Sequence, residues 1–156
     1  MLKYFFSTII FLFLSSCGYE AMYSKNNSIQ YNFSLSELNF VGDRIVNLQI
    51  KQRLDNYTQD KEKGEEKFRL DITTTSEKIT LVKDNEGNAS SFKIRIKVYV
   101  EVFVNSEIKK NLNLEEDFNY NNNLNKFALE SYEKQLKINL AETITNKLVL
   151  ELSNIK

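Results

Sequence analysis

The segment from Phe92 to Val104 constrains the fold more than any other part of the sequence, because apolar residues fill every second position. These apolar positions are Phe92, Ile94, Ile96, Val98, Val100, Val102 and Val104. The positions between them carry Lys93, Arg95, Lys97, Tyr99, Glu101 and Phe103. A period of two is that of a β-strand, whose successive side chains point to opposite faces of a sheet. The pattern therefore predicts a long strand with one face on the core and the other exposed.

A second long strand and a turn come before this segment. Phe68, Leu70 and Ile72 alternate with polar residues, which predicts a strand with the same period. Residues 84–88 read Asp-Asn-Glu-Gly-Asn. This stretch lacks the full length and terminal Glu of a calcium-binding loop, so a turn is favoured. The sequence thus predicts a hairpin of two long strands.

Two other segments have the apolar spacing of amphipathic helices. Asp43 is predicted to cap a helix from Arg44 to Tyr57, and a longer helix is predicted from Asn125 to about Ser153. The apolar positions of the first helix are Ile45, Val46, Leu48, Ile50, Leu54 and Tyr57. Those of the second are Leu129, Tyr132, Leu136, Leu140, Ile144, Leu148 and Leu152. Each set forms a stripe that must be buried against another element.

Two shorter strands complete the predicted set of elements, one from Leu35 to Val41 and one from Leu112 to Tyr120. If the apolar faces of the two helices pack on the apolar face of the sheet, the domain has two layers. The fold class predicted is α+β, with two helices packed on one face of a four-stranded, mostly antiparallel sheet. Residues 35–156 are expected to form this single domain.

The expected hairpin register creates a candidate binding surface on the outer face of the sheet. Folding the hairpin at residues 86–87 places Ile79 opposite Arg95 and Leu81 opposite Lys93, with Lys97 alongside. These five residues are called the hairpin surface below. Apolar side chains next to cations suit an amphipathic anion such as a phosphorylated lipid. The simpler interpretation is that exposed Lys and Arg keep the strand soluble, and a register error of one residue would turn both apolar residues inward.

The composition argues against several classes of function. The chain has no His, a single Cys, and 21 basic against 21 acidic side chains. It therefore lacks the ligands of a Cys/His zinc site, the base of a Ser-His-Asp triad and the basic excess of a nucleic-acid binder. The carboxylates of Glu115, Glu116 and Asp117 are adjacent, but strand alternation sends neighbours to opposite faces. We expect neither enzymatic activity nor a metal, and no cofactor besides a covalent lipid.

The single cysteine ends a segment typical of a targeting signal. Lys3 is followed by an apolar run from Tyr4 to Leu14, and then by two serines and Cys17. A basic start, a short apolar run and small residues describe a secretory signal peptide, predicted here over residues 1–16. The stretch Leu-Ser-Ser-Cys resembles a bacterial lipobox, although an ordinary signal with an incidental Cys is the alternative. Lipidation of Cys17 would attach the mature chain to a bilayer, with residues 17–34 as the lipidated N-terminus and tether.

The order of elements and several short motifs resemble the LptE family of lipopolysaccharide-assembly lipoproteins, especially its alphaproteobacterial form. The opening Cys17–Tyr23 is similar to that of the family, with Ala21 where the family usually has Pro. The other similar stretches are Leu38–Leu54, the two long strands, Phe118–Tyr120, Phe127–Ala128, Asn139–Ala141 and Ile144. The resemblance extends over essentially the whole mature chain.

The resemblance implies an α/β sandwich that is anchored at the periplasmic face of the outer membrane. It implies that the domain sits inside the LptD β-barrel as plug and partner, and that it contacts lipopolysaccharide. The hairpin surface is the part of the sequence on which we expect that contact. The alternative is a periplasmic auxiliary lipoprotein of another envelope lipid-transport complex, since such proteins also combine a lipobox with a small α+β domain.

Overall fold

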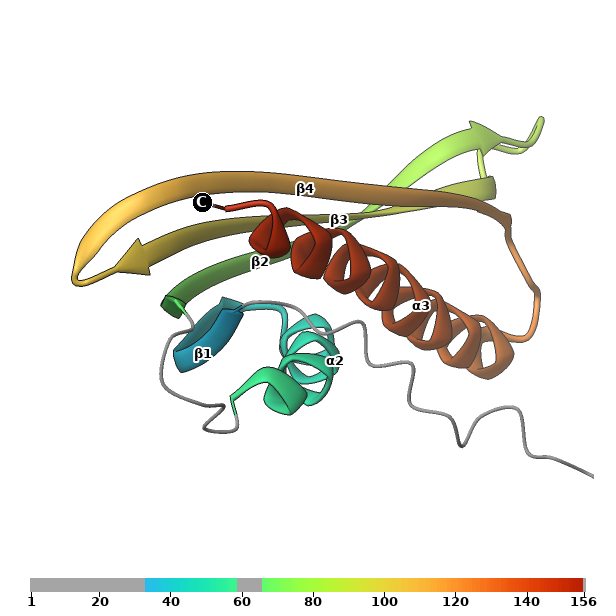
Figure 1. The fold of residues 1–156 in the computed structure, drawn as a ribbon. Helices are drawn as coiled ribbons and strands as arrows, with labels where there is room; N and C mark the ends of the chain where they lie inside the picture. Colours follow the sequence, from blue (N-terminus) through green and yellow to red (C-terminus); the bar gives the residue numbers. More distant parts are fainter. Residues whose placement is uncertain (1–32, 59–65, 156) are drawn as a thin grey trace, which may run out of the picture. The chain divides into compact units, whose positions relative to one another are not determined.

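The computed structural model describes residues 33–58 and 66–155 (Figure 1). Its strands are β1 (Phe33–Gly42), β2 (Glu66–Lys83), β3 (Ala89–Val104) and β4 (Glu107–Asn121). Its helices are α2 (Arg44–Leu54), a 3-10 turn η1 (Asp55–Tyr57) and α3 (Lys126–Ser153). The predicted signal peptide and Cys17 lie outside the described residues.

The predicted α+β fold class is confirmed. Four strands form one sheet in the order β1-β2-β3-β4, and α2 and α3 lie on the same face of it (Figure 1). The sheet is mixed, because β1 runs parallel to β2 while the other two pairings are antiparallel. The parallel pairing follows from the connection between β1 and β2. That connection contains α2, and parallel neighbours need a long crossover of this kind.

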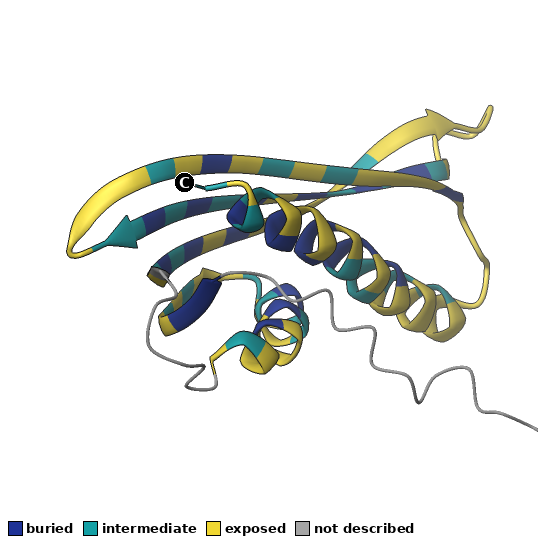
Figure 2. Ribbon diagram, viewed as in Figure 1, coloured by how far each residue is buried: buried dark blue, intermediate teal, exposed yellow. Residues whose placement is uncertain are grey.

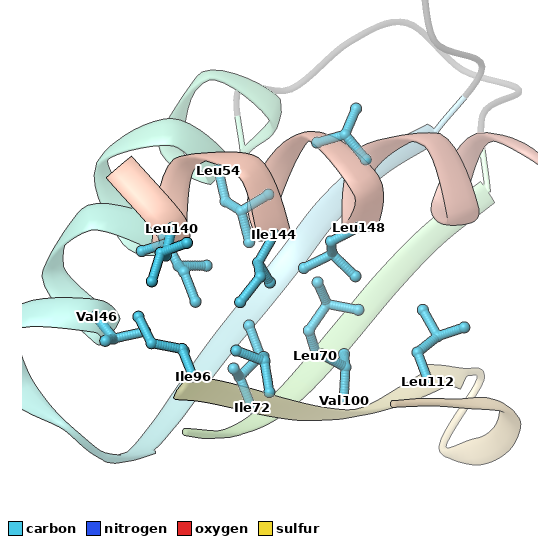
Figure 3. Close-up of a cluster of buried hydrophobic side chains, with 14 of the residues drawn as sticks. Val46, Leu54, Leu70, Ile72, Ile96, Val100, Leu112, Leu140, Ile144 and Leu148 are labelled. Atoms are coloured by element: carbon cyan, nitrogen blue, oxygen red, sulfur yellow. The ribbon is translucent and has the colours of Figure 1, made fainter. Parts of the chain in front are cut away.

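The period-two pattern of β3 is confirmed by burial. Every second side chain from Phe92 to Val102 is buried, and those from Ile94 onward are at most 1% exposed. The residues between them are half-buried or exposed, as the alternating bands in Figure 2 show. The buried side chains meet those of both helices in one core (Figure 3).

The first strand begins at Phe33, earlier than the predicted start of the domain at Leu35. Phe33 is only 2% exposed and its ring stacks on those of Tyr57 and Phe68, at centroid distances of 5.4 and 5.7 Å. Two residues assigned to the tether therefore belong to the sheet. Phe33 and Leu35 alternate with Ser34 and Ser36, so the period-two signal of the strand does extend to Phe33, and the sequence analysis overlooked it in an Asn-rich and Ser-rich stretch.

Both helices begin where the sequence predicts. The Asp43 carboxylate accepts hydrogen bonds from the first turn of α2, and the Asn125 side chain accepts one from Ala128 at the start of α3. Val46, Ile50 and Leu54 of α2 are fully buried, and most of the expected positions in α3 are buried. Two expected core positions are wrong, because Leu48 is 55% exposed and Tyr132 is 46% exposed.

The hairpin between β2 and β3 is confirmed, but its predicted register is wrong by two residues. Ile79 pairs with Lys93 rather than Arg95, and the register shifts between Thr80 and Val82, so Leu81 has no cross-strand partner. The Asp84 carboxylate accepts hydrogen bonds from the backbone N–H groups of Glu86 and Asn88, which fixes the turn at 84–88. A shift of two residues keeps every side chain on its face, so Ile79 still points outward.

The junction between β1 and α2 depends on Gly42. Its φ is +110°, a conformation that residues with a Cβ rarely adopt, and an added Cβ would lie 1.9 Å from the Thr74 carbonyl oxygen. That same carbonyl accepts a hydrogen bond from the Asp43 N–H at 3.3 Å. The close approach of this turn to β2 therefore requires the absence of a side chain.

We predict that Gly42→Ala lowers the free energy of unfolding by about 3 kcal/mol or more, because both strain and collision must be relieved. The matched control is Gly87→Ala in the hairpin turn, where φ is +87° but an added Cβ meets nothing within 4 Å. That variant should lose about 1 kcal/mol, the cost of the backbone conformation alone. Urea denaturation of both variants measures the difference. Equal losses would contradict the role given to the contact with Thr74.

The Asp43 side chain also joins α2 to α3. Its Oδ2 lies 2.9 Å from Lys137 Nζ, and its Oδ1 accepts hydrogen bonds from the N–H groups of Ile45 and Val46. Burial by itself raises the pKa of Asp43, but these hydrogen bonds and the Lys137 charge outweigh it, so the pKa lies below its usual value. A lowered pKa means that the ionised form stabilises the folded state.

We predict that Asp43→Asn lowers the free energy of unfolding by about 1 kcal/mol at neutral pH. Asn caps a helix about as well as Asp, so the loss isolates the charge interaction. In the native protein this stabilisation is complete above about pH 4 and disappears as the pH falls through the folded-state pKa. Urea denaturation from pH 7 to pH 2 should show the two proteins converging in acid. A constant difference over that range would contradict the prediction.

Candidate functional site

The structure brings together four of the five residues of the hairpin surface. Ile79 and Lys93 are direct cross-strand neighbours on the outer face, and Arg95 and Lys97 follow at two-residue steps along β3. Leu81 is 43% exposed but stands at the irregularity in β2, outside this row. The apolar share of the surface is therefore smaller than the predicted register implied.

Each of the three cations of the hairpin surface has an acidic partner on a neighbouring strand. Lys93 Nζ lies 3.1 Å from Asp117 Oδ2, and Arg95 Nε lies 3.0 Å from Glu115 Oε1. Lys97 Nζ lies 3.9 Å from Glu77 Oε1, at the edge of ion-pair range. Three cations thus face three carboxylates. The positive charges of the hairpin surface are therefore balanced by carboxylates of β2 and β4.

Two of the three acidic partners come from the segment Glu115–Asp117, whose side chains alternate as expected. Glu115 and Asp117 reach the outer face, whereas Glu116 points to the helices and pairs with Lys147 of α3. The ion pairs between β3 and β4 could have been predicted from the register of β4 on β3, which sets Arg95 opposite Asp117 and Lys97 opposite Glu115. That register depends on the whole β3–β4 hairpin.

These ion pairs are partly exposed, which limits how firmly they hold the cations. The Lys97 and Glu77 side chains are 47% and 49% exposed, and Arg95 is 30% exposed. Pairs of this kind contribute about 0–1 kcal/mol each, because water competes for both charges. A ligand phosphate that offers several acceptor oxygens can therefore displace a carboxylate partner at small cost.

The inner side of the same hairpin holds a polar and aromatic network that the sequence did not suggest. Glu133 Oε1 of α3 accepts hydrogen bonds from Lys78 Nζ at 2.6 Å and from the Tyr120 hydroxyl at 2.7 Å. Lys78 Nζ also lies 4.0 Å from the centre of the Phe92 ring. Burial, together with the Glu133 carboxylate, raises the pKa of Tyr120. The hydroxyl therefore stays protonated and ties β4 to α3.

A pocket of about 360 Å³ adjoins this network. Its lining combines charged and apolar side chains: Lys78, Asn122, Asn123, Leu124, Lys126, Leu129, Glu130 and Glu133. Leu124 is fully exposed and Phe127 is 79% exposed beside it. This end of the domain therefore presents apolar side chains and cations on the inner side as well as on the hairpin surface.

Other kinds of site find little support in the described ranges. Among residues 33–58 and 66–155, no group of three or more metal-binding side chains is placed to hold an ion. The Asp84 carboxylate is used by its own turn, where hydrogen bonds from Asn88 and Glu86 lower its pKa. In the same part of the chain, no helix has both the length and the apolar character needed to cross a membrane.

Comparison with known proteins yields matches among solved structures. No family model matches the sequence, and no curated protein matches it. Rare lipoprotein B from Shewanella oneidensis superposes with a TM-score of 0.53 at 17% identity, covering 76% of this chain and 97% of that one. A minor lipoprotein from Acinetobacter baumannii gives a TM-score of 0.52 at 15% identity, covering 76% and 94%. The chain has the fold of these bacterial lipoproteins.

A third structure extends the likeness. Lipoprotein B from Nitrosomonas europaea has a TM-score of 0.52 at 13% identity, covering 80% of this chain and 86% of that one. The similarity spans nearly the full length of each lipoprotein. At these identities the similarity describes the arrangement of the elements alone.

Proposed function

We propose that this protein is an outer-membrane lipoprotein of lipopolysaccharide transport and assembly. In this role it is the plug and partner of the LptD β-barrel and contacts lipopolysaccharide directly. The observation that carries the proposal is a fold shared with bacterial lipoprotein B over 97% of that protein's length. The lipobox-like sequence that ends at Cys17 supports the same assignment.

Lipidation of Cys17 accounts for the membrane attachment in this proposal. One acyl chain gives only marginal binding to a bilayer, whereas several chains on one residue hold a protein firmly. A modified thiol also removes the single free cysteine from an oxidising compartment. The lipid would attach the protein at the periplasmic face of the outer membrane. The folded domain from Phe33 onward would be joined to Cys17 through the intervening residues.

The outer face of the sheet supports the role as a barrel partner. Neither α2 nor α3 covers it, and its row of paired charges makes it polar without a large net charge. The lumen of a large outer-membrane barrel is also polar, so a face of this kind can pack there without burying an unpaired charge.

The hairpin surface supports contact with lipopolysaccharide. Lys93, Arg95 and Lys97 stand in a row on β3, beside Ile79. The phosphates of the glycolipid would replace Glu77, Glu115 and Asp117 as partners of the three cations. The apolar residues at this end, including the exposed Leu81, would meet the acyl chains.

Isolation of the tagged full chain from detergent-solubilised membranes tests the partner. We expect a stable complex with a large outer-membrane β-barrel that survives affinity and size-exclusion steps. The Cys17→Ser variant, which has no acylation site, should be lost from the membrane fraction. Recovery with an inner-membrane transporter instead of a barrel would overturn the proposal and favour an auxiliary protein of another lipid-transport complex.

Neutralisation of the hairpin surface tests the glycolipid contact. The triple variant Lys93→Gln, Arg95→Gln, Lys97→Gln should weaken lipopolysaccharide binding by about tenfold or more, because charge-assisted hydrogen bonds are lost. Gln is preferable to Glu here, since Glu would add repulsion next to three carboxylates. The matched variant Glu77→Gln, Glu115→Gln, Asp117→Asn removes the competing partners and should strengthen binding. Unchanged affinity in both variants, with unchanged circular dichroism, would contradict the assignment.

A further inference from the structure

A second pocket lies on the outer face of the sheet, at the opposite end from the hairpin surface. Its volume is about 300 Å³, which is at the lower end of the range for small-molecule sites. It is lined by Ser36, Glu37, Lys67, Arg69, Phe103, Asn105 and Ser106. We call it the Arg69 pocket.

Two local irregularities of the chain shape the Arg69 pocket. The register of β1 shifts between Leu35 and Glu37, and there the Ser36 hydroxyl donates a hydrogen bond to the Phe68 carbonyl at 3.1 Å. On the other side, Asn105 and Ser106 form the β3–β4 turn with φ values of +50° and +70°. Two consecutive positive φ values describe a tight turn that matches the twist of the strands. The rim of the pocket is therefore polar on both sides.

Arg69 is the residue that gives this pocket its chemistry. It stands opposite Glu37 on one side and Phe103 on the other, with its guanidinium carbon 4.0 Å from the centre of the Phe103 ring. Its closest ion-pair distance is 3.8 Å, to Asp71, which is beyond hydrogen-bond length. Its Nε is buried and has no hydrogen-bond partner. The guanidinium is thus partly desolvated and poorly compensated.

The neighbouring carboxylates do not supply the missing hydrogen bonds. The Asn39 amide donates to Glu37 Oε1 at 3.3 Å and to Asp71 Oδ1 at 3.0 Å, which directs both acids toward Asn39. Arg95 Nε on the hairpin surface is likewise buried without a well-aligned hydrogen bond, but it lies 3.0 Å from Glu115 Oε1, so a close carboxylate compensates the charge of Arg95. Lys67 also lines the pocket.

We propose that the Arg69 pocket binds the phosphate of a sugar phosphate. Phosphate oxygens would accept hydrogen bonds from the Arg69 guanidinium, whose planar fork matches two oxygens at once. Asn105 and Ser106 would bind the sugar hydroxyls, and the Phe103 ring stiffens the site by holding the guanidinium against it. The glycolipid as the source of the phosphate rests on the proposed function, whereas the chemistry of the pocket does not.

Titration of the full chain in detergent micelles with glucosamine 1-phosphate tests the pocket, followed by amide chemical shifts. We expect the largest shifts at Asn105 and Ser106 and a saturable binding curve. Arg69→Gln should raise the dissociation constant about tenfold or more, because two charge-assisted hydrogen bonds are lost. The matched control, Arg53→Gln on α2, removes an arginine that pairs with Glu142 outside both anion sites and should change the dissociation constant less than twofold. Equal effects of the two variants, shifts centred on residues 93–97, or no saturable binding would overturn the proposal.

Competition by lipid A in vesicles distinguishes the source of the phosphate. Displacement of bound glucosamine 1-phosphate from the native protein supports a glycolipid headgroup as the natural ligand. The Arg69→Gln variant should show no such displacement. Absence of competition overturns the glycolipid source and assigns the pocket to soluble sugar phosphates. Neither result depends on co-isolation with a barrel, so failure of this pocket and failure of the proposed function are separate outcomes.

Discussion

The inner face of β3 must be covered, and the rest of the domain is arranged to do so. β3 is paired on both edges, so its position in the sheet is set by β2 and β4. Its 16 residues extend about 53 Å, whereas the 28 residues of α3 extend about 42 Å. α2 covers part of the sheet beside α3, but neither helix reaches the hairpin tip (Figure 1). The exposure of Leu81 and Val82 follows from this mismatch.

Polar contacts hold α3 on the sheet at several points along its length. Glu133 near its start joins Lys78 and Tyr120, Lys137 reaches the cap of α2, and Glu151 near its end lies 2.8 Å from Lys110. Hydrophobic burial has no directional preference, so it alone would allow the helix to slide over the apolar face. The polar contacts select one position, which in turn determines which residues at the hairpin end stay exposed.

The sequence predicted what depends on local periodicity and missed what depends on pairing between distant segments. The inner residues of β3, the caps Asp43 and Asn125 and the turn at 84–88 all follow from neighbours within a few positions. The paired charges of Arg95 do not, because they require the register of β4. Leu81 was misplaced for the related reason that an irregularity in β2 leaves no trace in residue spacing. The Arg69 pocket needs three strands and a turn to exist at all.

The two ends of the outer face differ in how their cations are compensated, and this difference bears on how each end would bind an anion. At the hairpin end, a phosphate must displace carboxylates such as Glu115, so binding there exchanges one partner for another. At the other end, Arg69 has no carboxylate within hydrogen-bond distance, so a phosphate adds contacts without displacing any. A site where a phosphate must replace a carboxylate favours a multivalent and mobile ligand that is released readily. A site where a phosphate only adds contacts favours retention of a single phosphate group. Balanced net charge over the whole chain therefore does not imply equal affinity for anions at the two ends.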